Sequence, residues 1–177
     1  MKNLIKDILV EIGENPERDG LLKTPERVER AIRYLVKGYS EDENEIINGA
    51  IFDSPNNNMV IVKDIEFYSL CEHHMLPFFG KIKIAYLPNK KVIGLSKMSR
   101  IVEMYSRRLQ IQENLAYDIA KCVKRAINPR GIAISIEAFH LCIAMRGART
   151  QNSKTIATFY DGEFEKNDNL VEQFIKY

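Results

Sequence analysis

The placement of the histidines and cysteines constrains this chain more than any other feature, because it requires two distant segments to meet. The sequence contains three residues of each type. Two histidines lie in the run Cys-Glu-His-His at residues 71–74, and the third, His140, stands two residues before Cys142. Thiolate and imidazole are ligands that zinc prefers. A Cys-x-x-His step supplies two such ligands from one tight turn, and a distant cysteine can complete the set.

The number of ligands bears on the kind of zinc site. Three protein ligands with one open position are typical of a catalytic zinc, whereas a structural zinc is normally closed by four. We therefore hypothesise one catalytic zinc with spare histidines beside it. Cys71 and Cys142 taken singly could equally be buried thiols, and only their placement beside histidines favours a metal. Cys122 lies on the apolar stripe of a predicted helix and is interpreted as core. Glu72 either supports a ligand or is an ordinary strand-end carboxylate.

Length and charge narrow the class of protein. A chain of 177 residues fits one domain with a sizeable core. Lys and Arg total 26 against 24 Asp and Glu, a balance too even to indicate a nucleic-acid partner. The N-terminus lacks an apolar run of signal-peptide length, and no other run is long enough to span a membrane. An odd number of cysteines then favours a reducing cytosol over a disulfide framework. We expect a cytoplasmic protein without nucleic-acid or membrane partners.

Apolar spacing predicts two helices with buried stripes in residues 1–58. The first covers residues 2–12. The second begins at Thr24, which is expected to cap it, and ends at Gly38. The polar and acidic stretch that follows is interpreted as loop. The expected stripes are Leu4, Ile5, Ile8, Leu9 and Ile12 in the first helix and Val28, Ala31, Ile32, Leu35 and Val36 in the second.

From residue 59 the pattern changes to alternating strands, interrupted by helices. Strands are predicted over 60–67, 81–86, 92–95, 132–142 and 154–160. Helices are predicted from the cap Ser96, over 112–127 and over 168–176. Because helices and antiparallel-looking strand pairs lie in separate blocks, the predicted fold class is α+β.

Several charged residues are candidate ligand contacts. Lys97 and Arg100 lie in the first turn of the helix that Ser96 opens, where free N–H groups and the helix dipole favour an anion. The alternative is a solvated helix face, which spacing alone slightly favours. Arg146 follows the segment that contains His140 and Cys142, and from there it could reach a phosphate. Glu113 is the first acid of the 112–127 helix, and its alternative role is a favourable charge at a helix N-terminus.

The longer motifs resemble the GTP cyclohydrolase I family, and the resemblance covers most of the chain. The N-terminal stretch 20–28 is similar to the opening helix of that family. Several long motifs in this order are highly specific. They are Cys-Glu-His-His at 71–74, Val-Ile-Gly-Leu-Ser-Lys-Met-Ser-Arg-Ile-Val at 92–102, Arg-Leu-Gln-Ile-Gln-Glu at 108–113, His-Leu-Cys at 140–142, Met-Arg-Gly at 145–147 and Asn-Ser-Lys-Thr at 152–155.

The resemblance implies both a fold and a reaction. The fold is the tunnelling fold (T-fold), an antiparallel β-sheet with helices packed on one face plus N-terminal helices, assembled as a toroidal homodecamer with active sites at subunit interfaces. One domain would cover 1–177, with a helical segment over residues 1–58 and a catalytic segment over residues 59–177. The reaction is hydrolytic opening of the imidazole ring of GTP at C8, release of formate and rearrangement to 7,8-dihydroneopterin triphosphate, the first step of tetrahydrofolate or pterin biosynthesis.

The resemblance also implies a role for each matched residue. The positions that match the zinc ligands are Cys71, His74 and Cys142. Those that match the catalytic histidines are His73 and His140. Glu113, helped by Gln112, matches the position that holds the guanine edge. Those that match contacts to the ribose and triphosphate are Ser96, Lys97, Arg100 and Arg146, which Arg27 could join. Asn114 stands where many members carry arginine, which changes a helix-surface contact and leaves the guanine carboxylate in place.

The chemistry of these residue types agrees with that reaction. Zinc lowers the pKa of its water to about 7, and histidine suits proton delivery to ring nitrogens. A carboxylate can accept from the guanine N1–H and amino group, a donor pair that adenine lacks. A zinc nucleoside deaminase is rejected, because its Pro-Cys-x-x-Cys pair is absent from this sequence. Two alternatives stay open: a relative that binds nucleotide without catalysis, and an enzyme that stops at the ring-opened formamide.

Overall fold

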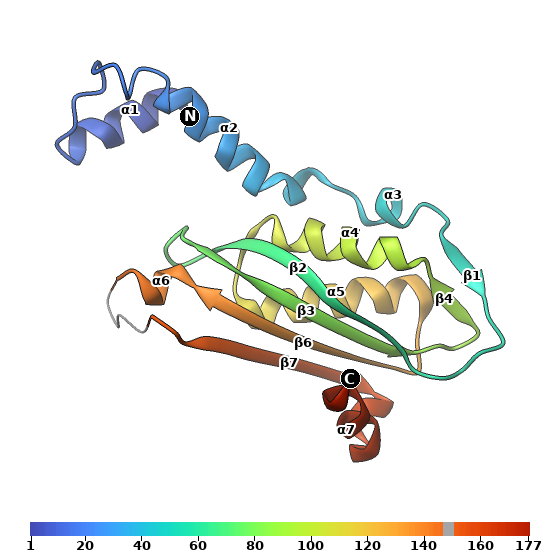
Figure 1. The fold of residues 1–177 in the computed structure, drawn as a ribbon. Helices are drawn as coiled ribbons and strands as arrows, with labels where there is room; N and C mark the ends of the chain where they lie inside the picture. Colours follow the sequence, from blue (N-terminus) through green and yellow to red (C-terminus); the bar gives the residue numbers. More distant parts are fainter. Residues whose placement is uncertain (147–150) are drawn as a thin grey trace.

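A curled, largely antiparallel sheet forms the body of the protein in the computed structural model, which describes residues 1–146 and 151–177 (Figure 1). Within these residues the sheet has five strands in the order β5-β2-β3-β6-β7. The pairs β2–β3, β3–β6 and β6–β7 are antiparallel, and β2–β5 is parallel. The predicted α+β class is confirmed. The strands are β2 (Val60–Cys71), β3 (Pro77–Leu87), β5 (Leu109–Gln110), β6 (Gly131–His140) and β7 (Lys154–Gly162).

The two faces of the sheet have different neighbours because successive side chains along a strand point to opposite sides. Helices α4 (Leu95–Ser106) and α5 (Gln112–Ile127) lie across one face, as Figure 1 shows. The opposite face is open around Tyr68, Phe79 and Phe139, which form an aromatic row across three strands. The core residues that face α4 and α5 and are fully buried include Ile82, Ile84, Ile132, Ile134 and Ile136.

The C-terminal helix α7 (Asp168–Lys176) adds a small second core to the open side. Phe164, in the short 3-10 helix η2 (Glu163–Glu165), and Phe174 in α7 pack with Ala85, Leu87 and Ala133. These alanines and leucine alternate with the residues that face α5, so α7 covers the far side of the sheet at one end. The predicted helix over 168–176 is confirmed.

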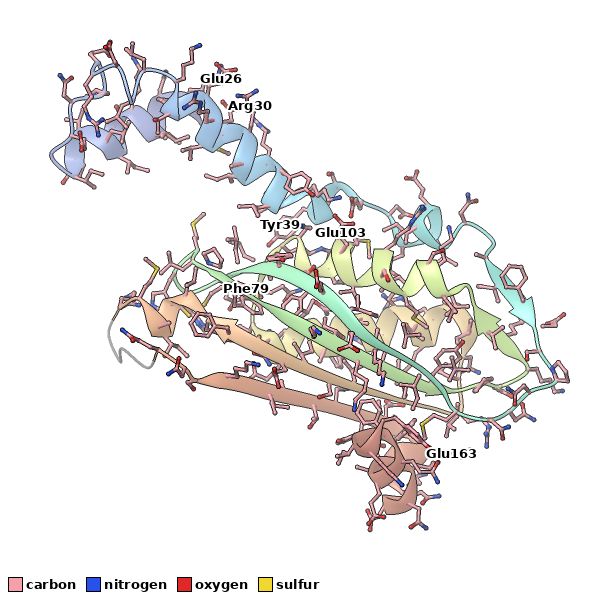
Figure 2. All side chains as sticks on the ribbon, in the orientation of Figure 1. Glu26, Arg30, Tyr39, Phe79, Glu103 and Glu163 are labelled. Carbon is pink, nitrogen blue, oxygen red and sulfur yellow. The ribbon has the colours of Figure 1, made fainter. Side chains whose placement is uncertain are left out.

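The N-terminal arm extends from this body. It consists of α1 (Lys2–Glu11), α2 (Thr24–Leu35), the 3-10 helix η1 (Lys37–Ser40) and α3 (Glu43–Ile47). Figure 1 shows α1 and α2 reaching beyond the sheet, and Figure 2 shows Glu26 and Arg30 projecting from α2 away from it. Only Ile5 and Leu9 are buried within α1, and only Pro25 within α2.

The predicted buried stripes of the arm are therefore wrong for most of their members. Leu4, Ile8 and Ile12 are exposed, and the stripe of α2 is at most half-buried. The apolar spacing is genuine, and α1 and α2 contact each other, but within residues 1–146 and 151–177 this contact leaves most of these side chains exposed or half-buried. Helical periodicity identifies an apolar face and does not say which chain covers it.

The arm is anchored to the body at η1. The Gly38 N–H donates to the Arg107 carbonyl over 3.0 Å, and the Arg108 Nε–H donates to the Gly38 carbonyl over 3.1 Å. A Cβ on Gly38 would lie 1.9 Å from the Met104 carbonyl oxygen, so a larger residue would force η1 away from α4. Tyr39 and Glu103 mark this junction in Figure 2.

Several local predictions need correction. Thr24 is the first residue of α2, and Lys23 occupies the cap position. Ser96 likewise lies inside α4, whose cap position is Gly94. The polar and acidic stretch after the second predicted helix, interpreted as loop, contains α3, and the short strand β1 (Ile51–Asp53) follows and pairs with β4 (Lys91–Ile93). The predicted helix over 112–127 is confirmed. No helix among the described residues combines the length and hydropathy that crossing a bilayer requires.

Candidate metal centre and active site

The register of the sheet brings the two cysteine–histidine segments to the same end. Strand β2 ends at Cys71, and its Leu70 is paired with Pro77 at the start of β3. The next residue of β3, Phe78, is paired with His140 at the end of β6. Because both pairings are antiparallel, β2 and β6 run in the same direction on either side of β3, and their C-terminal ends lie at the same end of the sheet. This pairing brings together two segments that residues 75–139 separate in the sequence.

Local turns then aim the ligands inward. After Cys71 the chain turns back at once: the Met75 N–H donates to the Cys71 carbonyl over 2.8 Å, and the Cys71 N–H donates to the Leu76 carbonyl over 2.9 Å. Met75 takes the left-handed conformation that closes this turn. Cys142 was predicted on a strand, but it lies in the short helix α6 (Leu141–Ala144), which bends away from the sheet after His140.

Cys71, His74 and Cys142 form the one three-residue group within the described residues whose ligand atoms could share an ion. Their two sulfurs and one imidazole nitrogen all lie within 4.8 Å of one another. Cys71 is buried, Cys142 is half-buried and His74 is exposed, so one side of the group faces solvent. Burial raises the pKa of the Cys142 thiol, and the neighbouring Cys71 adds to that effect. Two thiols and an imidazole at this spacing fit a tetrahedral cation that keeps one open position.

His140 lies beside this group in a fixed orientation. Its Nε2 is 2.7 Å from the Oε1 of Gln112, and its Nδ1 is 4.0 Å from the Cys142 sulfur. The Phe78 ring stacks on the imidazole with 4.7 Å between centroids and 6° between planes. Burial lowers the pKa of His140, an effect that the Glu113 carboxylate opposes. The imidazole is therefore held mostly neutral near pH 7.

His73 occupies a more open position at the edge of the site. Its Nδ1 lies 3.9 Å from the Cys71 sulfur, and its Nε2 lies 3.9 Å from a carboxylate oxygen of Glu72. Both side chains of the Glu72–His73 pair are largely exposed, so their attraction is weak. A histidine in this place can exchange protons with solvent while facing the same space as His140.

A cavity of about 310 Å³ joins these residues. Larger hollows among the described residues, such as one of about 500 Å³ beside α7, contain none of the predicted site residues, so size alone is a poor guide here. Glu113, exposed at the N-terminal end of α5, is part of the wall. The predicted site residues that line the smaller cavity are Cys71, His73, His74, Gln112, Glu113, His140 and Cys142.

The remaining predicted contacts are divided between two places. Arg146 follows α6, and its charge partly opposes the rise in the pKa of the Cys142 thiol that burial causes. Ser96, Lys97 and Arg100 lie in the first turns of α4, next to β4, at the end of the body away from α6 (Figure 1). The described chain does not bring these three residues to the cavity. Gly147, the last residue of the Met-Arg-Gly motif, lies outside the described residues.

Two features of the site were missed from the sequence. The stacking of Phe78 on His140 becomes visible only when β3 and β6 are paired in register. The hydrogen bond between Gln112 and His140 joins the first residue of a helix to the last residue of a strand. Neither contact leaves a signal in local spacing.

The chain is similar to known proteins over almost its whole length. The family described as GTP cyclohydrolase I matches residues 1–177. GTP cyclohydrolase 1 of Campylobacter jejuni subsp. jejuni serotype O:6 is 51% identical over 173 residues, which cover 98% of this chain and 91% of that protein. The Leptospira biflexa protein of the same name is 48% identical over 175 residues, which cover 99% and 96%.

A solved structure described as an archaeosine synthase QueF-Like in the apo form shares 19% identity, with a TM-score of 0.49 over 62% of this chain and 97% of that chain. Family membership is shown by the relatives near 50% identity and by the family match over the full length of the chain. The chain belongs to the GTP cyclohydrolase I family.

Proposed function

We propose that the cavity at the ends of β2 and β6 is where this GTP cyclohydrolase I carries out its complete reaction. Water opens the imidazole ring of GTP at C8, C8 leaves as formate, and the remainder rearranges and closes to 7,8-dihydroneopterin triphosphate, the first step of tetrahydrofolate or pterin biosynthesis. One observation supports this best: Cys71, His74 and Cys142 converge within 4.8 Å in the cavity that His73 and His140 also line.

We propose Zn²⁺ as the ion that Cys71, His74 and Cys142 hold, because this donor set and its open side fit a catalytic zinc. Zinc there would supply Lewis-acid assistance to the attack of water at C8. The thiols require a reducing compartment, which supports a cytoplasmic location.

The histidines take complementary parts in proton transfer. His140, neutral and aimed toward the metal ligands, can accept a proton at Nδ1. His73, at the exposed edge, can deliver a proton to a ring nitrogen and be recharged from solvent. Each group of this kind typically contributes about 10²–10⁴-fold to a rate. Two such groups suit a reaction that opens one ring and closes another.

Guanine recognition falls to the N-terminal end of α5. The Glu113 carboxylate, with Gln112 beside it, can accept hydrogen bonds from the N1–H and the amino group of guanine. Adenine offers no such donor pair, so a purine without it would leave the carboxylate unpaired. The helix N-terminus also presents free N–H groups to the same space.

The triphosphate contacts support an assembly of several copies. Arg146 directly follows α6, at the end of the body where the cavity lies, whereas Ser96, Lys97 and Arg100 lie at the other end of the body. We propose that a second copy brings its α4 turn to this cavity, so that active sites form at subunit interfaces in a homodecamer. The exposed apolar side chains of the arm also support an assembly, because another copy can cover them.

Zinc content and GTP turnover measured on one purified sample test the proposal. We expect about one zinc per chain, a pterin-like absorbance spectrum, and formate released in step with GTP consumed. Zinc and GTP binding without formate would instead support the enzyme that stops at the ring-opened formamide or the relative without catalysis.

A further inference from the structure

We propose that the side chain of Gln112 is a positioning residue for His140 and not a guanine contact. It holds His140 in the tautomer that carries its proton on Nε2, and so turns the unprotonated Nδ1 toward the metal ligands. The inference rests on the proposed function, since that function gives the free Nδ1 its task.

The amide nitrogen of Gln112 is fully engaged inside the protein. The side chain is 2% exposed. Its Nε2 donates to the main-chain carbonyl of Ile136 in β6 over 2.8 Å and to that of Thr155 in β7 over 3.1 Å. A primary amide has two N–H donors, and these two carbonyls take both. None is left for the O6 or a ring nitrogen of guanine.

These two bonds also fix which way the amide points. If the amide were turned over, its oxygen would face two carbonyl oxygens, and none of the three could donate a hydrogen bond. The amide oxygen must therefore face His140, whose Nε2 lies 2.7 Å away. An amide oxygen only accepts, so the proton of that bond belongs to the histidine.

The tautomer of His140 follows. A neutral imidazole carries one proton, and Nε2 must hold it, so Nδ1 keeps its lone pair. Nδ1 is the nitrogen that lies 4.0 Å from the Cys142 sulfur. The Phe78 ring, stacked on the imidazole at 4.7 Å, opposes a rotation that would exchange the two nitrogens. The opposite tautomer would set two acceptors against each other 2.7 Å apart.

Guanine binding is then left to Glu113 and the main chain of α5. Glu113 is exposed and lines the cavity, whereas the neighbouring Gln112 is buried and its side-chain atoms are bonded to β6, β7 and His140. Adjacent residues at the start of one helix thus have different partners: Glu113 binds the substrate, and Gln112 binds His140.

The first test is the tautomer itself. Solid-state ¹⁵N NMR of zinc-loaded protein labelled only at histidine resolves protonated from unprotonated ring nitrogens, and the sequence has three histidines to assign. We expect His140 to show a protonated Nε2 and an unprotonated Nδ1, with the signals assigned by their loss in His140→Asn. A protonated Nδ1 in the wild-type protein would overturn the proposal without any variant of Gln112.

The second test separates positioning from substrate contact. Gln112→Met keeps the length of the side chain and removes its hydrogen bonds. We expect kcat for GTP to fall by about 10–100-fold, the usual cost of losing such a supporting group, with KM little changed. A His140 spectrum that becomes a mixture of tautomers should accompany the fall. A raised KM with unchanged kcat would show that the amide contacts GTP.

Gln110→Met is the matched control. Gln110 is also buried in the cavity wall, and its Nε2 donates to the Tyr105 carbonyl and the Asp118 carboxylate without reaching His140. We expect a comparable loss of thermal stability, an unaltered His140 spectrum and a smaller loss of kcat. If the wild-type protein released no formate, the proposed function would fail, while the wild-type tautomer would still decide the role of Gln112.

Discussion

Helices α5 and α2 have similar apolar patterns in the sequence but differ in how far they are buried in the structure. Eight of the 16 residues of α5 are buried against the sheet, whereas within the 12 residues of α2 only Pro25 is buried. Figure 1 shows the cause: α5 lies across the body, and α2 extends beyond it. An apolar stripe thus predicts a helix and identifies its apolar face. Which segment packs against that face has to be learned from the structure.

The predicted site residues are also divided, in this case within the body. Those at the ends of β2 and β6 and at the start of α5 converge on one cavity, while Ser96, Lys97 and Arg100 lie at the far end of the body. Each region of the molecule can be disturbed separately, and the expected effects differ in size. Loss of a metal ligand should be the largest.

Cys142→Ser should remove both zinc and GTP turnover. A hydroxyl is a far weaker zinc ligand than a thiolate, and the remaining two ligands are too few for a protein zinc site. Metal analysis and formate release measure the outcome. Cys122→Ala is the control, because Cys122 is buried in the core, where burial raises its pKa to about 12. Full activity in metal-free Cys142→Ser protein would refute the site.

His140→Ala should keep zinc and lose at least about 10²-fold in kcat. The three ligand atoms do not depend on His140, but the group poised to accept a proton is gone. Metal content and single-turnover formation of product separate these two effects. Zinc loss with the rate intact would contradict the assigned role.

The sequence predicted the body better than the arm, and the reasons are physical. The helix over 112–127 has strong apolar periodicity, and the metal residues are rare types, so both stand out locally. Strands β1 and β5 have three and two residues, which are too few to show an alternation of apolar and polar residues. They are recognised only by their pairing with β4 and β2. The stack of Phe78 on His140 likewise depends on strand register, which local patterns do not contain.

Truncation of one isoleucine in each region should show the same contrast in stability. Ile119→Ala in α5 removes a side chain with no exposed surface and should lower the free energy of unfolding by about 2–5 kcal/mol. Ile8→Ala in α1, where the side chain is 57% exposed, should cost about 0.5 kcal/mol or less in a dissociated chain. Urea unfolding at low protein concentration provides both values.

Substitutions in the arm should instead change the oligomeric state. If another copy covers α1, the pair Leu4→Ser and Ile8→Ser should yield smaller particles in analytical ultracentrifugation while the circular dichroism of the chain stays unchanged. The outward Glu26→Gln on α2 is a control for a change of charge alone. Wild-type sized particles in the serine variant would show that this face is not an interface.

A small effect, which depends on pH, is expected at the joint between the two regions. Glu43, the first residue of α3, accepts hydrogen bonds from the Arg125 guanidinium at 2.6 and 3.1 Å and from the Tyr105 hydroxyl. Burial would raise the pKa of Glu43, but the bonds from Arg125 and Tyr105 outweigh it and hold the pKa below its ordinary 4.5. Because the carboxylate is favoured in the folded state, its contribution is present above pH 4.5 and is lost as the pH falls through the lowered pKa.

Glu43→Gln should therefore cost about 0.5–1 kcal/mol at pH 7, and the difference from wild type should shrink below pH 4.5. Taking that difference cancels any effect of metal loss in acid that both proteins share. Glu137→Gln, which breaks the more exposed pair with Lys154 on the open face of the sheet, is the matched control and should change stability less. Equal losses in the two variants, or a Glu43→Gln difference that does not vary with pH, would show that this ion pair does not hold the arm to the body.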